Sequence, residues 1–93
     1  MKTIIHLQKE EIQFLRFPKN DVLTNYNEIN LREKDLERAC SLGNLEHIKV
    51  KITFADFEMS LYEIETTVWG ITEDSLCLKG HLFLPKRAIV ALN

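Results

Sequence analysis

Residues 63–92 read EIETTVWGITEDSLCLKGHLFLPKRAIVAL, and this stretch decides the fold. Short runs rich in β-branched, aromatic and leucine residues alternate with turn residues, which is typical of closely spaced strands. The expected strands cover residues 61–71, 76–79, 81–84 and 88–92. Gly70 lies inside the first run and indicates a bulge or a sharp bend. Pro85–Arg87 (PKR) predicts a short turn, or one turn of 3₁₀ helix, before the last strand.

An amphipathic helix is expected over Asn30–Leu42. Asn30 can cap its N-terminus, and Glu33 stands three positions later, as in a capping box. The apolar residues fall within about half of a helical wheel, and they are Leu31, Leu36, Ala39, Cys40 and Leu42. Gly43 predicts the end of the helix, because glycine readily takes the left-handed conformation that stops helices.

From His47 onward the hydrophobic period changes from helical to two. Residues 48–54 alternate apolar and polar side chains, which predicts a strand with one buried face. Lys49 and Lys51 lie on its polar face, where they can pair with Glu63 and Glu65 of the next strand. Paired carboxylates could also serve acid–base catalysis, but only in a cleft, and carboxylates on an outward strand face are usually just solvated.

Residues 1–29 are expected to be an appendage to a domain formed by residues 30–93. The alternation within 5–17 fits a hairpin or a short helix over Glu10–Leu15 that stops before Pro18. This segment could also add a strand of its own and cover an open sheet edge. Together the two parts form one globular unit.

Length and composition indicate one small globular domain without a membrane span. The chain has 93 residues, 45% of them hydrophobic and 28% charged, which is ordinary for a folded domain. No apolar run is long enough for a membrane span or a secretory signal, so we expect a cytoplasmic protein whose Cys40 and Cys77 are buried, reduced thiols. The net charge of −2 means that nucleic-acid binding would need a local basic patch.

The segment WGITEDSLCLKG, followed by HLFLPKRAIVAL, resembles the second half of the Sm-like family, whose bacterial branch includes an RNA chaperone. In that branch a Leu-Leu-Lys strand is followed by a step into the last strand, which here reads Pro85-Lys86-Arg87-Ala88-Ile89. The resemblance covers about residues 30–92. It implies a mainly β, α+β fold in which one N-terminal helix precedes a small, strongly bent, five-stranded SH3-like or Sm-like barrel. It also implies a homo-oligomer and an RNA partner.

Two groups of residues are candidates for binding. Lys79, Lys86 and Arg87 could contact an anion such as nucleic acid, although basic residues at turns often serve only solubility. Phe57, Met59 and Trp69 are expected outside the main apolar face. They could form a partner surface, or residues 1–29 could simply cover them.

Nothing in the sequence indicates an enzyme, a metal site or a cofactor. His6, His47 and His81 lack the spacing of metal ligands. His81 could approach Cys77 across a tight turn, but no Asp or Asn can be placed to orient the imidazole. We therefore expect a non-enzymatic binding module that self-associates through exposed edges at Leu82–Leu84 and Ala88–Leu92. The alternative is an RNA-binding protein that uses the basic turn.

Overall fold

The structure, a computed structural model, describes residues 3–93. The chain begins with strand β1 (Ile4–His6), a 3₁₀ helix η1 (Lys9–Phe14) and the long helix α1 (Tyr26–Glu46). Six strands follow, and the second 3₁₀ helix, η2 (Lys86–Ala88), precedes the last of them. These strands are β2 (Val50–Ala55), β3 (Leu61–Thr66), β4 (Val68–Ile71), β5 (Ser75–Leu78), β6 (Leu82–Pro85) and β7 (Ile89–Leu92).

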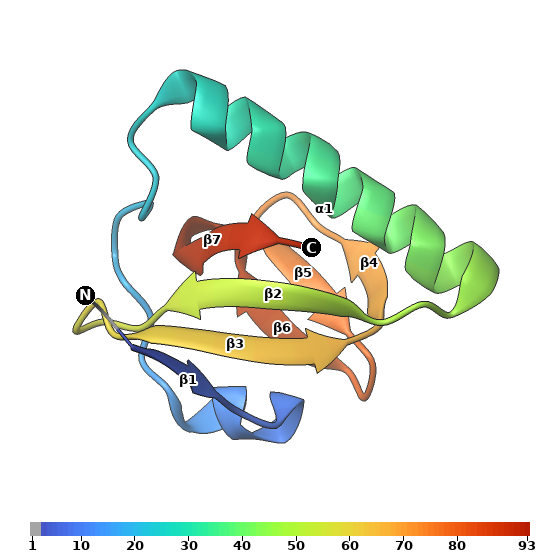
Figure 1. The fold of residues 1–93 in the computed structure, drawn as a ribbon, viewed down its shortest axis with the longest axis horizontal. Helices are drawn as coiled ribbons and strands as arrows, with labels where there is room; N and C mark the ends of the chain where they lie inside the picture. Colours follow the sequence, from blue (N-terminus) through green and yellow to red (C-terminus); the bar gives the residue numbers. More distant parts are fainter. Residues whose placement is uncertain (1–2) are drawn as a thin grey trace.

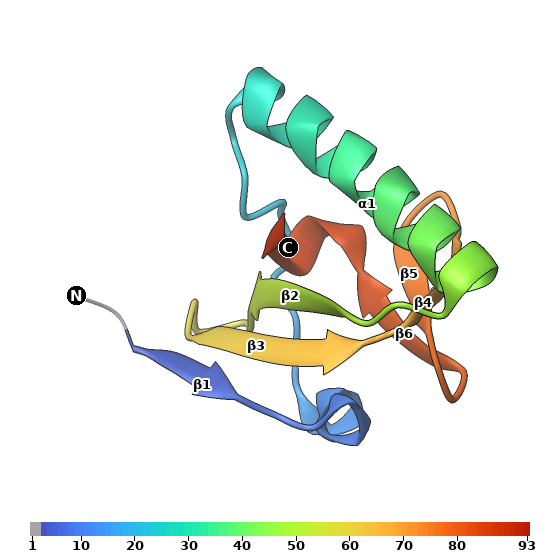
Figure 2. The ribbon, with the colours of Figure 1, turned by 45° about the vertical axis from the view of Figure 1, so that its right-hand side comes forward.

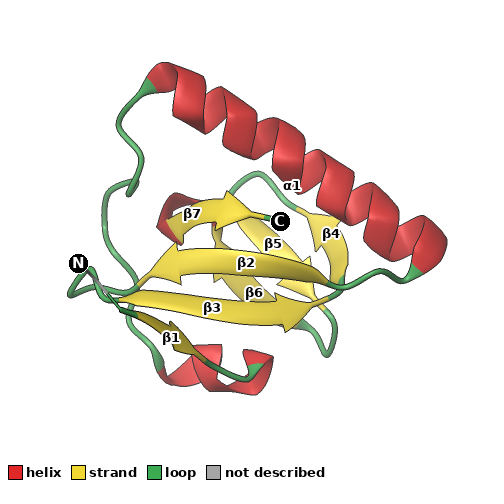
Figure 3. Ribbon diagram, in the orientation of Figure 1, coloured by secondary structure: helices red, strands yellow, loops and turns green. Residues whose placement is uncertain are grey.

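The strands form two open sheets that face each other across the core (Figure 3). The first sheet has the order β1-β3-β2-β7, and the second has the order β4-β5-β6. All neighbouring strands are antiparallel except β1, which pairs parallel to β3. Fully buried side chains of both sheets meet in the core, together with Ile12 of η1 and Leu36 of α1.

The expected five-stranded barrel is wrong, because two helices fill the places where a barrel would close. α1 packs against β4 and β7 on one side of the molecule, and η1 packs against β3 and β6 on the other (Figures 1 and 2). The run expected as one strand, 61–71, breaks at the buried Thr67, where the chain leaves the first sheet for the second. The fold is therefore α+β with two open sheets.

The turns within the second sheet follow the sequence pattern closely. The register of β4 against β5 shifts between Val68 and Gly70, so the bulge expected near Gly70 is confirmed. Gly80 has a φ of 90° in the turn between β5 and β6. The 3₁₀ turn expected at Pro85–Arg87 is also confirmed, one residue later, as η2.

Helix α1 is longer than the sequence pattern indicates. The side chain of Asn25 caps it by accepting hydrogen bonds from the amides of Asn27 (2.8 Å) and Glu28 (3.3 Å). The last residue of the helix is Glu46, and His47, which follows it, has a left-handed φ of 56°. Gly43, expected as the stop, lies inside the helix. A boundary at residue 30 therefore falls within α1.

The buried face of α1 also differs from the expected one. Its buried residues follow the spacing i, i+4, i+7, i+11, and they are Arg32, Leu36, Ala39 and Gly43. Leu31 is 60% exposed. Cys40 is half-buried and packs against the core, and Cys77 is half-buried on β5; neither forms a disulfide. The two thiols, expected to be buried, are therefore only partly buried.

Residues 3–25 supply one strand and one 3₁₀ helix. Of the two alternatives for this segment, the short helix expected over Glu10–Leu15 is confirmed as η1, and the hairpin is not formed in these residues. Ile12 of η1 is 2% exposed and belongs to the core. Within the described residues, no helix has both the length and the apolar character needed to cross a membrane.

Candidate functional site

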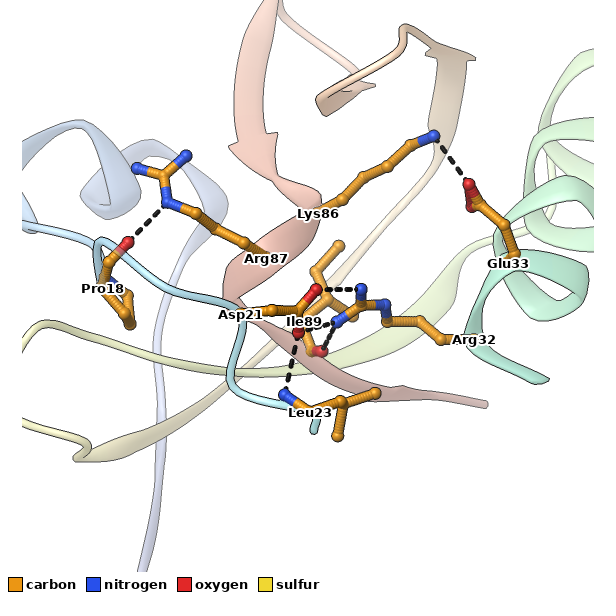
Figure 4. Close-up of polar contacts among 8 residues, drawn as sticks. All are labelled: Pro18, Asp21, Leu23, Arg32, Glu33, Lys86, Arg87 and Ile89. Atoms are coloured by element: carbon orange, nitrogen blue, oxygen red, sulfur yellow. Dashed lines mark hydrogen bonds and ion pairs between the residues drawn. The ribbon is translucent and has the colours of Figure 1, made fainter. Parts of the chain in front are cut away.

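A buried arginine joins the segment before α1 to the edge of β7 (Figure 4). The guanidinium of Arg32 donates two hydrogen bonds to the carboxylate of Asp21, at 2.8 and 2.6 Å. It donates a third, at 2.9 Å, to the backbone carbonyl of Ile89. The Arg32 side chain is only 6% exposed, so Asp21 balances a charge that is almost removed from water.

The same contacts set the ionisation of Asp21. Partial burial alone would raise the pKa of this carboxyl group, since desolvation disfavours the charged form. The hydrogen bonds from Arg32 and from the Leu23 amide outweigh that effect, so the pKa lies below its ordinary value. Asp21 is thus held in its charged form by the residues that it ties together.

The basic turn expected to contact an anion is engaged within the protein. Lys86 forms an ion pair with Glu33 of α1 at 3.0 Å, and the Arg87 side chain donates a hydrogen bond to the carbonyl of Pro18 (Figure 4). The cleft at this turn has a volume of about 260 Å³. Its lining mixes three cations with four carboxylates: Arg32, Lys86, Arg87, Asp21, Glu33, Glu73 and Asp74. A phosphate would meet more negative than positive charge there.

Lys79 lies away from the other two basic candidates. It follows β5 at the turn into β6, whereas Lys86 follows the far end of β6. In the register of this hairpin, Leu78 pairs with Leu82 at one end and Ser75 with Pro85 at the other. The structure therefore brings Lys86 and Arg87 together and separates Lys79 from them by the length of the hairpin.

The three apolar candidates also divide into two places. Phe57 and Met59, 52% and 43% exposed, lie in the turn between β2 and β3. Trp69 lies on β4 in the other sheet and contacts His81. Residues 3–29 bury none of the three, although the guanidinium of Arg16 lies over the Phe57 ring, 5.1 Å from its centroid. They therefore form two separate surfaces rather than one.

The turn that carries Phe57 and Met59 is held by Asp56. One carboxylate oxygen of Asp56 accepts hydrogen bonds from the amides of Glu58 and Ser60, both at 3.0 Å. The other accepts from the phenol of Tyr62 at 3.1 Å, and this bond raises the pKa of the phenol. Met59 sits at this turn with a left-handed φ of 64°.

Met59 borders two neighbouring cavities. The larger, about 450 Å³, lies between this turn and residues 18–24. The smaller, about 300 Å³, lies between the turn and β1, where Ile5 and Leu61 also line it. The apolar surface at this turn thus continues up to the outer strand of the first sheet.

Strand β1 forms an exposed edge of that sheet (Figure 2). All of its residues are exposed, including Ile4 at 39% and Ile5 at 45%. In a strand pair, every second residue directs its backbone N–H and C=O groups towards the neighbouring strand. The amide of Leu7 donates to the carbonyl of Glu63 at 2.9 Å, so Leu7 is one of the residues of this set. Residues 5 and 7 therefore face β3, and the backbone groups of Ile4 and His6 point away from the sheet.

The other edge strands, β4, β6 and β7, have further elements of the chain beside them. On β7, the carbonyl of Ile89 accepts a hydrogen bond from the Arg32 side chain. Two residues earlier, the carbonyl of Arg87 accepts one from the amide of Val22. Helix α1 packs along β4, and η1 packs along β6. The edges expected to be open, Leu82–Leu84 and Ala88–Leu92, thus lie beside other elements of the chain.

The histidines, cysteines and carboxylates singled out in the sequence lie apart from one another, with one exception at His6. Within residues 3–93 no three His, Cys, Asp or Glu side chains come together as metal ligands would. Cys77 stands opposite Phe83 on β6, not opposite His81. Glu63 lies 3.5 Å from the imidazole of His6 on the outer face of the first sheet. Lys51 stands opposite Glu65, as expected from the strand pattern.

The sequence interpretation missed the Asp21–Arg32 pair. It allowed for a strand added by residues 1–29, which β1 confirms, but it did not identify residues 4–6 or the pairing with β3. The burial of Arg32 could have been predicted from the helical spacing 32, 36, 39, 43, provided that an arginine and a glycine are accepted as members of a buried helix face. Nothing in residues 4–6 alone indicates pairing with a strand more than fifty positions later. Comparison with protein-family models, with curated proteins and with solved structures gives no match to this chain.

Proposed function

We propose that this protein is a non-enzymatic interaction module that self-associates through the outer edge of β1. The observation that carries the proposal is the outward direction of the backbone groups of Ile4 and His6 on an exposed strand. Unpaired N–H and C=O groups on a strand edge are a template for another strand. The partner is a second copy of the same chain, since a strand edge is complementary to itself in an antiparallel pair.

The alternation of β1 defines the expected geometry of the dimer. With Ile5 on a two-fold axis, Ile4 of one copy stands opposite His6 of the other. These two residues then exchange both of their backbone hydrogen bonds, as in the hydrogen-bonded pairs of an antiparallel ladder. The two Ile5 residues form the central non-hydrogen-bonded pair, with Cα atoms about 4.5 Å apart. Two four-stranded sheets would thereby become one continuous sheet.

The apolar surroundings of β1 favour such an association. Ile5 and Met59 line the cavity of about 300 Å³ beside the strand, which a partner side chain can fill. The strand is only three residues long, so the interface falls well below the roughly 1,600 Å² of a standard stable complex. We therefore propose a weak, concentration-dependent dimer. We also propose a cytoplasmic location, which the two unbridged cysteines support.

Sedimentation equilibrium tests the proposal. The wild-type mass should rise from monomer towards dimer as the concentration increases from about 0.01 to about 1 mM, as mass action requires. Ile5→Lys should keep the protein monomeric, because two ammonium groups would meet on the two-fold axis. Ile4→Pro should do the same, because it removes an outward amide while sparing the bonds to β3.

Leu45→Lys is the matched control. Leu45 is 81% exposed at the end of α1, so the variant makes the same chemical change far from β1 and should dimerise like the wild type. A wild-type protein that stays monomeric over the whole range would refute the proposal. A dimer that Ile5→Lys leaves intact would assign self-association to another surface.

A further inference from the structure

The outer face of the second sheet carries two exposed aromatic rings with small residues between them. Leu76, Leu78 and Leu84 are fully buried, so the alternate residues of β5 and β6 face outward. Phe83, one of these, is 55% exposed. Trp69 is 40% exposed at the bulge of β4, where the register shifts between Val68 and Gly70.

Only small residues lie between the two aromatic rings. Gly70 stands opposite Cys77, and Cys77 stands opposite Phe83. β5 separates β4 from β6, so at a strand spacing of about 4.8 Å the two aromatic residues lie about 10 Å apart. The face is thus a shallow trough with an aromatic side chain at each margin.

His81 holds Trp69 in place. The two rings pack edge to face with centroids 5.3 Å apart and an interplanar angle of 84°. His81 sits in the turn Lys79–His81, where its amide donates to the carbonyl of Leu78 at 3.1 Å. The amide of Lys79 donates to the carbonyl of Thr67 at 3.0 Å, which fixes the same turn next to the start of β4. A ring fixed in this way loses little side-chain entropy on binding.

The charge of this face is positive at one end and neutral elsewhere. Strands β4, β5 and β6 contain no acidic residue. Lys79 is exposed and forms no ion pair within residues 3–93, whereas Lys86 is paired with Glu33. Glu73 and Asp74 lie in the turn at the opposite end of this sheet. At the Lys79 end, Lys9 of η1 lies beside Gly80 and balances the carboxylate of Glu10. An anionic ligand therefore has one favourable end at which to dock.

We propose that this face binds single-stranded nucleic acid, with bases stacked on Trp69 and Phe83 and a phosphate at Lys79. Every base has a flat apolar surface, and base–aromatic stacking contributes about 1–3 kcal/mol per base without requiring a sequence. A duplex hides those surfaces, so single strands are the ligand class that fits. α1 packs against β4 and η1 packs against β6, the two edge strands of this sheet, so its outer face is the more open surface.

Binding should be weak and only mildly dependent on salt. The net charge of −2 provides no long-range attraction for a polyanion. Single-strand binding loses about 0.7 log units of affinity per log unit of salt for each phosphate neutralised, so one contact at Lys79 predicts a slope near that value. A protein that binds through a broad basic surface would have a much steeper slope.

The fluorescence of Trp69 reports directly on this site, because it is the only tryptophan. Titration with a single-stranded oligothymidylate should quench the emission to saturation, and the matching duplex should quench it far less. Phe83→Ala should weaken the affinity by about tenfold, as expected for the loss of one stacked base. Lys79→Gln should weaken it and abolish most of the salt dependence.

Phe57→Ala and Lys51→Gln are the matched controls, since both residues are exposed but lie on the other sheet or its turn. Neither should change the quenching. Ile5→Lys should also leave it unchanged, so a failure of the β1 dimer would not count against this site. Absence of quenching, or quenching that survives Phe83→Ala and Lys79→Gln together, would overturn the proposal. Saturable quenching by an apolar peptide but not by the oligonucleotide would overturn it as well and would assign the face to a protein partner.

Discussion

Gly43 of α1 lies directly against the backbone carbonyl of Val68 on β4. A Cβ atom at position 43 would be 2.0 Å from that oxygen, far inside contact distance. The close approach lets the helix backbone rest on the edge of the second sheet. It also explains why a glycine stands within a long helix, where it is intrinsically unfavourable.

Gly43→Ala should destabilise the protein by about 1–3 kcal/mol, the usual range for overpacking a tight contact. The gain in helix propensity of about 1 kcal/mol acts in the opposite direction, so a net loss identifies the contact with Val68. Urea unfolding measures the difference. Gly70→Ala is the control, since the nearest atom to its added Cβ is 4.0 Å away. Equal stability of the two variants would contradict the close packing of α1 on β4.

The Asp21–Arg32 pair predicts an asymmetric response to mutation. Asp21→Ala should cost about 3 kcal/mol, because it leaves the buried guanidinium of Arg32 without its carboxylate. Arg32→Leu should cost less, because it removes the buried charge and fills the space with apolar atoms while Asp21 can still reach water. Glu33→Ala, which breaks the more exposed pair with Lys86, should cost less than about 1 kcal/mol. Unfolding free energies in urea give the order, and the reverse order of the first two variants would contradict it.

Asp21 should also make stability depend on acid pH. Its pKa is lower in the folded state than the ordinary value of 3.8, so the folded protein holds this proton less tightly than the unfolded chain does. The stabilisation is complete above that ordinary value and is lost as pH falls through the lowered folded pKa. The stability difference between the wild type and Asp21→Asn should therefore shrink below about pH 4. A difference that stays constant down to pH 2 would contradict this linkage.

The 3₁₀ helix η1 offers a matched pair of substitutions. Ile12→Ala should destabilise the protein by about 2–5 kcal/mol, because Ile12 is 2% exposed and packs in the core. Phe14→Ala, two residues later, should have little effect, since Phe14 is 79% exposed. Thermal unfolding followed by circular dichroism distinguishes them. If both variants were equally stable, η1 would be an appendage rather than a part of the core.

Local sequence signals determined most of the secondary structure. The switch from helical period to period two near His47 correctly separates α1 from the strands. The bulge at Gly70, the reversal at Gly80 and the 3₁₀ turn after Pro85 were all predictable, because each depends on the backbone freedom or restriction of one or two residues. These features are encoded within a few positions, so the sequence states them directly.

Tertiary structure alone decided how these elements close around the core. The buried stripe of α1 includes Arg32 and Gly43, which a search for large apolar side chains does not select. Arg32 is buried because Asp21 balances its charge and the Ile89 carbonyl accepts a hydrogen bond from it. Gly43 is buried because the backbone of Val68 lies against it. Likewise, β1 finds its partner in β3 far along the chain, and η1 and α1 fill the gaps that a barrel would have closed with hydrogen bonds. Contacts between distant residues depend on complementarity in three dimensions, which hydrophobic period does not record.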